Sequence, residues 1–545
     1  MRRHSQFENP SAGIDGMSGG SNDDNSHRPD GMHPESDPMH LSDVNADREP
    51  TSVPTPGQLE TRQPAGLWVL FITEMWERFS YYGMRALLVL YLIASTSAEI
   101  ENSGGERVVN SNPGFGWTEA NAALLYAVYT WAVYLTPIFG GWMADKFLGT
   151  HRSMLIGGWI IAAGHIVLAC TEFFGITAGE AVTLQTGPGA LLAFVTGLVL
   201  IVIGTGFFKP CVSVMVGQLY GKDDKRRDSG FTIFYMGINL GAFLSPLIAG
   251  TLGQKVGWHW GFGSAAVGMI LGLICYQYLR PKYLAGIGLS PKALRAEGGE
   301  AARQNDEDRK RPIDAVDIQR IIVILILAFV GNIFFWAAFE QAGSSLNVFA
   351  DQNTDRTILG YEFPSTWYQA VNALTIVICA PFFSILWVWL ERNNANPSTP
   401  MKFSLGLWLL GMAFIAMVFG SLQARDGDLA GPHWLLITYV LCTWGELCLS
   451  PVGLSMVTKL APVKLQSLMM GVWFLSFSLA NLMGGLLAAF STKFKPGPDG
   501  EPAEITFVID GLPGFFLLLV LLPFVAGVVL ALMSPFLKRM MHGIK

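Results

Sequence analysis

Twelve long apolar runs constrain the fold of this chain more than any other feature of its sequence. A helix needs about 20 predominantly apolar residues to cross the roughly 30 Å of hydrocarbon in a bilayer. Runs of this kind cover residues 66–94, 118–143, 152–174, 189–213, 230–252, 261–280, 319–345, 366–390, 402–422, 433–458, 466–491 and 512–537. A polar stretch, residues 281–318, divides them six and six. We therefore expect an all-α polytopic membrane protein with two six-helix bundles, residues 63–280 and 319–545, and a charged cytoplasmic linker between them.

The composition agrees with a membrane protein. Charged residues make up 14% of the 545 residues and apolar residues 51%, whereas soluble proteins carry about 25% charged residues. The net charge of −6 offers no basic footprint for nucleic acid. All six cysteines fall within apolar runs, which predicts buried thiols rather than disulfides or metal ligands. Residues 1–62 are rich in Ser, Asp, Asn, Gly and Pro, and we expect a disordered cytoplasmic tail there.

The distribution of Lys and Arg predicts the orientation of the chain. If the N-terminus is cytoplasmic, the inner loops, their flanks and the C-terminal end hold 22 of these residues, and the outer loops hold six. Cytoplasmic loops of membrane proteins carry such an excess. We therefore expect an integral protein of the plasma (inner) membrane with both termini in the cytoplasm.

The first apolar run carries four charges at membrane depth: Glu74, Glu77, Arg78 and Arg85. A charge at the centre of a membrane helix costs about 2.5–3.5 kcal/mol, and such residues usually line a cavity or pathway. At about 100° per residue, Glu74, Arg78 and Arg85 share one face of the helix with Tyr81. This face predicts a helix beside an aqueous cavity, and therefore a transporter.

Three further ionisable residues, Lys209, Glu340 and Glu446, lie deep in other apolar runs. Together with the first run they give three cations and four carboxylates from both halves of the chain. This near-balance predicts ion pairs across a cavity, because an unpaired buried charge costs far more than a paired one. For any single pair, a static structural bridge is the alternative interpretation.

The same charges narrow the kind of transport. Fixed charges of both signs suit a zwitterion better than an inorganic ion, and carboxylates in a cavity of low dielectric can exchange protons near neutral pH. The sequence has no GxxxxGK[ST] loop for ATP-driven transport. It also shows no nucleophile, base and orienting residue that would indicate an enzyme.

Five motifs in order resemble those of one transporter family. E-M-W-E-R-F-S-Y-Y-G (74–83) matches the ExxERFxYYG motif of the proton-dependent oligopeptide transporters, a branch of the major facilitator superfamily. G-G-W-M-A-D-K-F-L-G-T-H-R (140–152) resembles the loop motif of the superfamily, and F-Y-M-G-I-N-L-G (234–241) is similar to the family's fifth-span signature. F-W-A-A-F-E-Q (335–341) and G-E-L-C-L-S-P-V-G-L (445–454) resemble its seventh- and tenth-span motifs. The resemblance covers most of the chain after the tail.

The resemblance implies a major facilitator fold and a proton-coupled symporter that imports di- and tripeptides by alternating access. Proton coupling would involve Glu74, Glu77, Arg78 and Glu340. An extracellular gate would pair Arg85 with Glu340, and a cytoplasmic gate would pair Lys209 with Glu446. The peptide-binding residues would be Arg78, Tyr82, Arg85, Tyr134, Lys209, Asn239, Trp336, Asn372, Glu446, Ser450 and Trp473. Protons, peptides and the bilayer would be the partners of a monomer that needs no other cofactor and no metal.

Departures from the family pattern refine this expectation. Ala127 stands where mammalian members have a functional histidine, which excludes a histidine relay and leaves the carboxylates, as in prokaryotic relatives. Residues 281–318 are too polar for the two extra helices of many prokaryotic members, and Ala373 replaces a common proline beside Asn372. Two alternatives remain open: transport of another substrate such as nitrate, and a peptide sensor that does not transport.

Overall fold

The computed structural model describes residues 62–101, 107–220, 224, 226–289, 312–425, 428–462, 465–496 and 502–544. The predicted tail, apart from its last residue, and most of the predicted linker lie outside these residues. Everything below concerns the part of the chain that follows residue 61.

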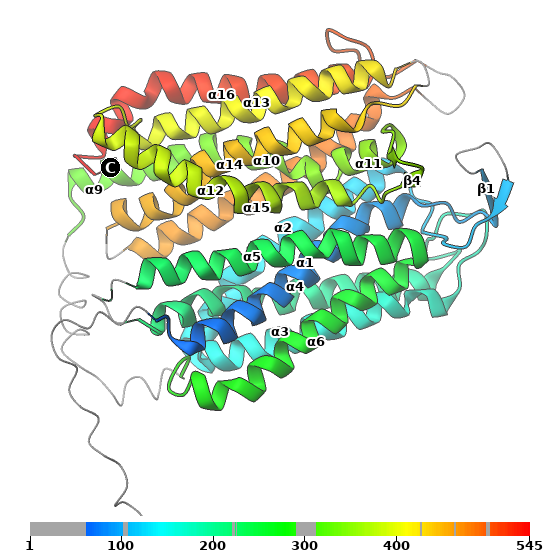
Figure 1. Ribbon diagram of the computed structural model, residues 1–545. Coiled ribbons are helices and arrows are strands. Elements are labelled where there is room, and N and C mark those ends of the chain that lie inside the picture. The colour runs from blue at the N-terminus through cyan, green and yellow to red at the C-terminus, as the bar shows by residue number, and fades with distance from the viewer. Residues whose placement is uncertain are drawn as a thin grey trace, which may run out of the picture. The chain divides into compact units, whose positions relative to one another are not determined.

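The N-terminal half is helical, with one short hairpin (Figure 1). Its helices are α1 (Ala65–Ile93), α2 (Glu119–Met143), the π-helix η1 (Ala144–Leu148), α3 (Thr150–Ala169), the 3₁₀ turn η2 (Cys170–Phe174), α4 (Pro188–Gln218), α5 (Arg227–Thr251), the π-helix η3 (Leu252–Val256) and α6 (Trp258–Tyr283). Strands β1 (Glu99–Glu101) and β2 (Arg107–Val109) pair antiparallel between α1 and α2.

The C-terminal half repeats this plan with a more broken first span. Its elements are α9 (Ala315–Ile326), the π-helix η4 (Leu327–Asn332), α10 (Ile333–Phe339), the 3₁₀ turn η5 (Glu340–Gly343), α11 (Ser345–Gln352), β3 (Thr357–Ile358), β4 (Tyr361–Glu362), α12 (Trp367–Arg392), α13 (Thr399–Gln423), α14 (Pro432–Leu460), α15 (Gln466–Ser491), η7 (Thr492–Phe494) and α16 (Leu512–Met540). Strands β3 and β4 form a second antiparallel hairpin. Both hairpins lie at the same end of the helices, which we call the hairpin end (Figure 1).

Twelve membrane-spanning helices are present in the described residues, as the sequence predicts. Eleven are long and apolar enough to cross a bilayer. Helix α1 is the twelfth: it has 29 residues, but its four charges lower its mean hydropathy. The seventh span differs from the predicted continuous run 319–345, because it extends to Gln352 and changes to a 3₁₀ turn at Glu340. Irregular backbone at membrane depth is tolerated only where it is buried in protein or lines a cavity.

Close helix packing depends on glycine at a few crossings. A Cβ on Gly204 would lie 2.6 Å from the carbonyl oxygen of Gly157, and one on Gly445 would lie 2.8 Å from that of Gly406. Small residues of this kind let membrane helices approach each other closely.

The N-terminal and C-terminal halves contact each other mainly along two helix pairs, α2 with α15 and α5 with α12.

Candidate functional site

The charged face of α1 forms an ion cluster. Arg78 Nε lies 2.7 Å from Glu74 Oε1 and 3.2 Å from Glu77 Oε2. Both carboxylates are buried. The spacing of four residues places Glu74 and Arg78 one turn apart on one face. The structure therefore brings these three residues together, and their role in proton coupling stays a prediction.

A second ion pair joins the two halves of the protein. Arg85 on α1 pairs with Glu340 at the start of the 3₁₀ turn η5, and both side chains are buried. Arg85 Nε also donates to the hydroxyl of Tyr126, 2.6 Å away, and that hydroxyl lies 3.5 Å from Glu340 Oε2. A Cβ on Gly343 would lie 2.0 Å from the Tyr126 oxygen and 2.9 Å from Arg85 Nε, so a larger residue in the turn would have to displace these side chains. The predicted contact is present, and its role as a gate stays a prediction.

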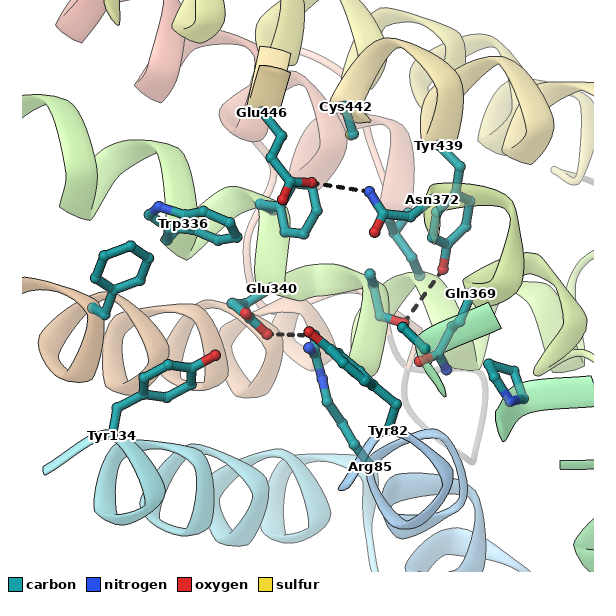
Figure 2. Close-up of a pocket in the computed structure, with 16 residues that line it drawn as sticks. Tyr82, Arg85, Tyr134, Trp336, Glu340, Gln369, Asn372, Tyr439, Cys442 and Glu446 are labelled. Atoms are coloured by element: carbon teal, nitrogen blue, oxygen red, sulfur yellow. Dashed lines mark hydrogen bonds and ion pairs between the residues drawn. The ribbon is translucent and has the colours of Figure 1, made fainter. Parts of the chain in front are cut away.

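A cavity lies between the two halves, directly beside this ion pair (Figure 2). Helices α1 and α2 contribute to one wall, and α10, α12, α14 and α15 contribute to the other. The predicted site residues that line it are Tyr82, Arg85, Tyr134, Trp336, Glu340, Asn372 and Glu446. Half of the predicted site residues therefore share one space.

Glu446 lies on the wall of this cavity that belongs to the C-terminal half. Its Oε2 accepts a hydrogen bond of 3.0 Å from Asn372 Nδ2, which also donates to Thr443 Oγ1 at 2.9 Å. Gln369 Nε2 and Trp336 Nε1 are buried and have no hydrogen-bond partner among the described residues. The cavity thus offers a carboxylate, which suits a ligand that carries a cation. The unpaired donors of Gln369 and Trp336 belong to side chains in the cavity wall.

The second predicted ion pair is not formed. In the described part of the chain no ion pair joins Lys209 to Glu446. The Lys209 ammonium instead lies 3.7 Å from the ring centre of Tyr134, a cation–π contact, while Asn372 engages Glu446. The Lys209–Glu446 gate therefore stays a prediction for another conformation of the transport cycle.

Five predicted peptide-binding residues are not among the described residues that line the cavity: Arg78, Lys209, Asn239, Ser450 and Trp473. Asn239 Nδ2 donates to the Tyr235 carbonyl of its own helix at 2.9 Å. Trp473 is 2% exposed and packs edge-on against Phe403. In this conformation the amide of Asn239 therefore bonds to its own helix and the indole of Trp473 packs among other rings. Direct ligand contact by these residues stays a prediction.

Sequence reasoning missed several cavity residues that helical spacing could have found. Tyr439 and Cys442 precede Glu446 by seven and four residues on α14, and Gln369 precedes Asn372 by three on α12. Residues at these spacings lie on one helix face. Helical spacing could not have identified Tyr126, because its partner Glu340 lies on another helix, 214 positions away in the sequence.

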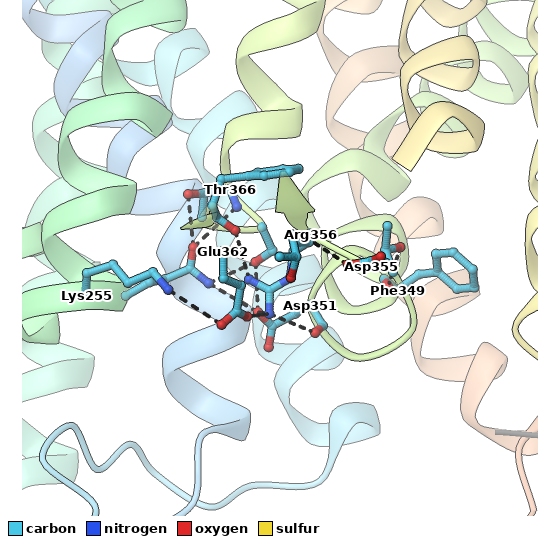
Figure 3. Close-up of polar contacts among 12 residues, drawn as sticks. Lys255, Phe349, Asp351, Asp355, Arg356, Glu362 and Thr366 are labelled. Atoms are coloured by element: carbon cyan, nitrogen blue, oxygen red, sulfur yellow. Dashed lines mark hydrogen bonds and ion pairs between the residues drawn. The ribbon is translucent and has the colours of Figure 1, made fainter. Parts of the chain in front are cut away.

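Polar contacts also join the two halves at the hairpin end (Figure 3). Gln254 Nε2, in the N-terminal half, donates to Ser365 Oγ at 2.9 Å and to Asp351 Oδ1 at 3.2 Å, and its Oε1 accepts from Thr366 Oγ1 at 3.2 Å. A Cβ on Gly250 would lie 2.1 Å from that Thr366 oxygen. These contacts join the two halves at the hairpin end.

Further ion pairs lie around these contacts. Within the C-terminal half, Arg356 pairs with Glu362 at 2.9 Å and with Asp351 at 3.6 Å. Between the halves, Lys495 pairs with Glu119 at 2.7 Å. The hairpin end is therefore held by several contacts besides Arg85 and Glu340.

Twelve spanning helices in two halves, with a charged cavity between them, define an integral membrane transporter. A model of the POT family matches residues 151–286 and 299–501, more than half of the chain. The uncharacterized transporter YclF of Bacillus subtilis is 39% identical over 520 residues, which cover 88% of this chain and 96% of that protein. The peptide transporter YePEPT of Yersinia enterocolitica is 35% identical over 496 residues, which cover 80% of this chain and 90% of that protein.

Solved structures agree with these sequence relatives. A crystal structure of the peptide transporter POT in complex with sulfate has a TM-score of 0.71 and 35% sequence identity to this protein, and the match covers 88% of this chain and 96% of that chain. The chain belongs to the POT family.

Proposed function

We propose that this protein is a proton-coupled symporter that imports di- and tripeptides by alternating access. The observation that carries the proposal is the cavity itself, where Arg85 lies on one half and Glu446 on the other. A peptide is a zwitterion, and a guanidinium suits its carboxylate as a carboxylate suits its ammonium group. Gln369 and Trp336 would donate to its carbonyl oxygens.

Relatives support a peptide as the substrate. The relative YePEPT is named a peptide transporter, and a protein of Lactococcus lactis that is 36% identical to this chain is named a di-/tripeptide transporter. A further solved POT family transporter, 28% identical, is in complex with 5-aminolevulinic acid. That compound, like a dipeptide, carries an amino group and a carboxylate.

Carboxylates beside buried cations would carry the protons. The ion pair of Glu340 with Arg85 joins the two halves. Protonating Glu340 would weaken this pair and so favour opening at the hairpin end. Glu74 and Glu77 would exchange protons beside Arg78. In this arrangement the hairpin end is extracellular, both termini are cytoplasmic, the protein is a monomer of the plasma membrane, and protons are the only coupling partner.

Uptake into liposomes tests the proposal. Purified protein should take up di-alanine faster when the outside is acidic, and an uncoupler should abolish the difference. Glu340→Gln should abolish uptake driven by the proton gradient and spare peptide counterflow. Uptake that ignores both pH and the uncoupler would refute proton coupling.

A competition panel tests the substrate. Tripeptides and 5-aminolevulinic acid should compete with di-alanine, and nitrate should not. Competition by nitrate alone would favour the first alternative from the sequence. Peptide binding without uptake would favour a sensor.

A further inference from the structure

A second cavity lies at the end of the C-terminal half that is opposite the hairpins. It has a volume of about 540 Å³ and lies where α12 ends, α13 begins and α16 ends. Its charged lining consists of Lys402, Lys538, Arg539 and one carboxylate, Glu391. It shares no lining residue with the central cavity.

Cations outnumber carboxylates in the lining of this cavity, although Glu391 attracts Lys402 electrostatically. Within the described ranges, none of Lys402, Lys538 and Arg539 forms an ion pair. The Lys402 ammonium lies 4.5 Å from the ring centre of Trp387, and Glu391 accepts a hydrogen bond of 2.7 Å from Asn396. Three cations that face one space repel one another, and an anion between them would remove that repulsion. Guanidinium and ammonium groups bind phosphate oxygens well.

The helix faces that lead away from this cavity are apolar and exposed. On α16, Leu532 and Phe536 precede Arg539 by seven and three residues, which places all three on one face. Leu532 is 77% exposed and Phe536 is 60% exposed. Helix α12 repeats the pattern with Ile385 and Trp389, 67% and 58% exposed. Because these faces belong to spanning helices, they lie at the depth of lipid acyl chains.

We propose that this cavity binds the head-group phosphate of an anionic phospholipid, whose acyl chains lie along the exposed faces of α16 and α12. Lys402, Lys538 and Arg539 would surround the phosphate. Basic pockets at the cytoplasmic ends of spanning helices bind anionic head groups in this way. The inference requires only that this end lies at a membrane surface, so it does not depend on the transported substrate.

Native mass spectrometry of the whole protein in detergent tests the site, with phosphatidylglycerol and phosphatidylcholine as probes. We expect phosphatidylglycerol to bind at least tenfold more tightly than phosphatidylcholine. The double variant Lys538→Gln/Arg539→Gln should lose that preference. The matched control is Arg280→Gln/Lys282→Gln, which removes two cations from the last turn of α6, as the test variant does for α16. The control should keep the preference.

Each other outcome would overturn the proposal. Equal loss in both double variants would indicate diffuse surface charge rather than a site. Displacement of phosphatidylglycerol by an equal concentration of inorganic phosphate would indicate a site for a free anion, and equal binding of both lipids would show that no anion is recognised. If the double variant does not fold, the single variant Lys402→Gln on α13 replaces it, and it should likewise weaken the preference for phosphatidylglycerol over phosphatidylcholine.

Discussion

Replacing Gln254 by Ala should shift the protein toward a conformation that is open at the hairpin end. The change removes four hydrogen bonds between the halves, one each to Asp351 and Ser365 and two from Thr366. Each intramolecular hydrogen bond contributes about 0.5–1.5 kcal/mol net, and water at this rim would replace part of that. We therefore expect the closed conformation to lose about 2 kcal/mol of stabilisation, which raises the ratio of open to closed molecules roughly 30-fold.

Spin labels can measure this shift. Val109 and Ile358 lie on the hairpins of opposite halves and are exposed, so cysteines there accept labels without disturbing the core. Pulsed electron spectroscopy should show a longer-distance population in Gln254→Ala. The control is Lys255→Gln, because the exposed Lys255–Glu362 pair is 3.9 Å long and such pairs contribute about 0–1 kcal/mol. Unchanged distances in Gln254→Ala, or equal changes in both variants, would refute the reasoning.

Two further predictions concern the central cavity. Glu446→Gln should keep the contact with Asn372 but lose the attraction for an ammonium group, so the KM for di-alanine should rise about 10- to 100-fold, the factor for a charged hydrogen bond of 1.5–3 kcal/mol. An unchanged KM would place the amino group elsewhere. Gly343→Ala should reduce proton-driven uptake at least tenfold, because the added Cβ would lie 2.0 Å from the Tyr126 hydroxyl. The control Gly471→Ala should transport normally, because no atom of the described residues lies within 4 Å of its added Cβ. Equal uptake by both glycine variants would show that Tyr126 is dispensable.

The sequence predicted the spans and the charged residues well, because both follow from strong local rules. Apolar length determines a span, and a buried charge signals a cavity through its cost. Contacts between distant segments were harder to predict. The 3₁₀ turn at Glu340 and the partner Tyr126 depend on how α2 packs against the C-terminal half, which no periodicity records. The Lys209–Glu446 pair was expected from the family resemblance, but a resemblance does not determine which conformation brings two side chains together.

The position of the Arg85–Glu340 pair explains how binding and opening could be linked. Breaking a buried pair by neutralising one partner costs about 3–5 kcal/mol, because the other charge is left uncompensated. If Glu340 takes a proton, Arg85 must find another anion, and the same cavity is open to a peptide carboxylate. Proton and peptide would then each make the other's binding easier, which is the reciprocity that coupled transport requires. The Gln254 contacts oppose opening without titrating in this way. They would determine the free-energy difference between the closed and open states, whereas protonation of Glu340 would trigger the change from closed to open.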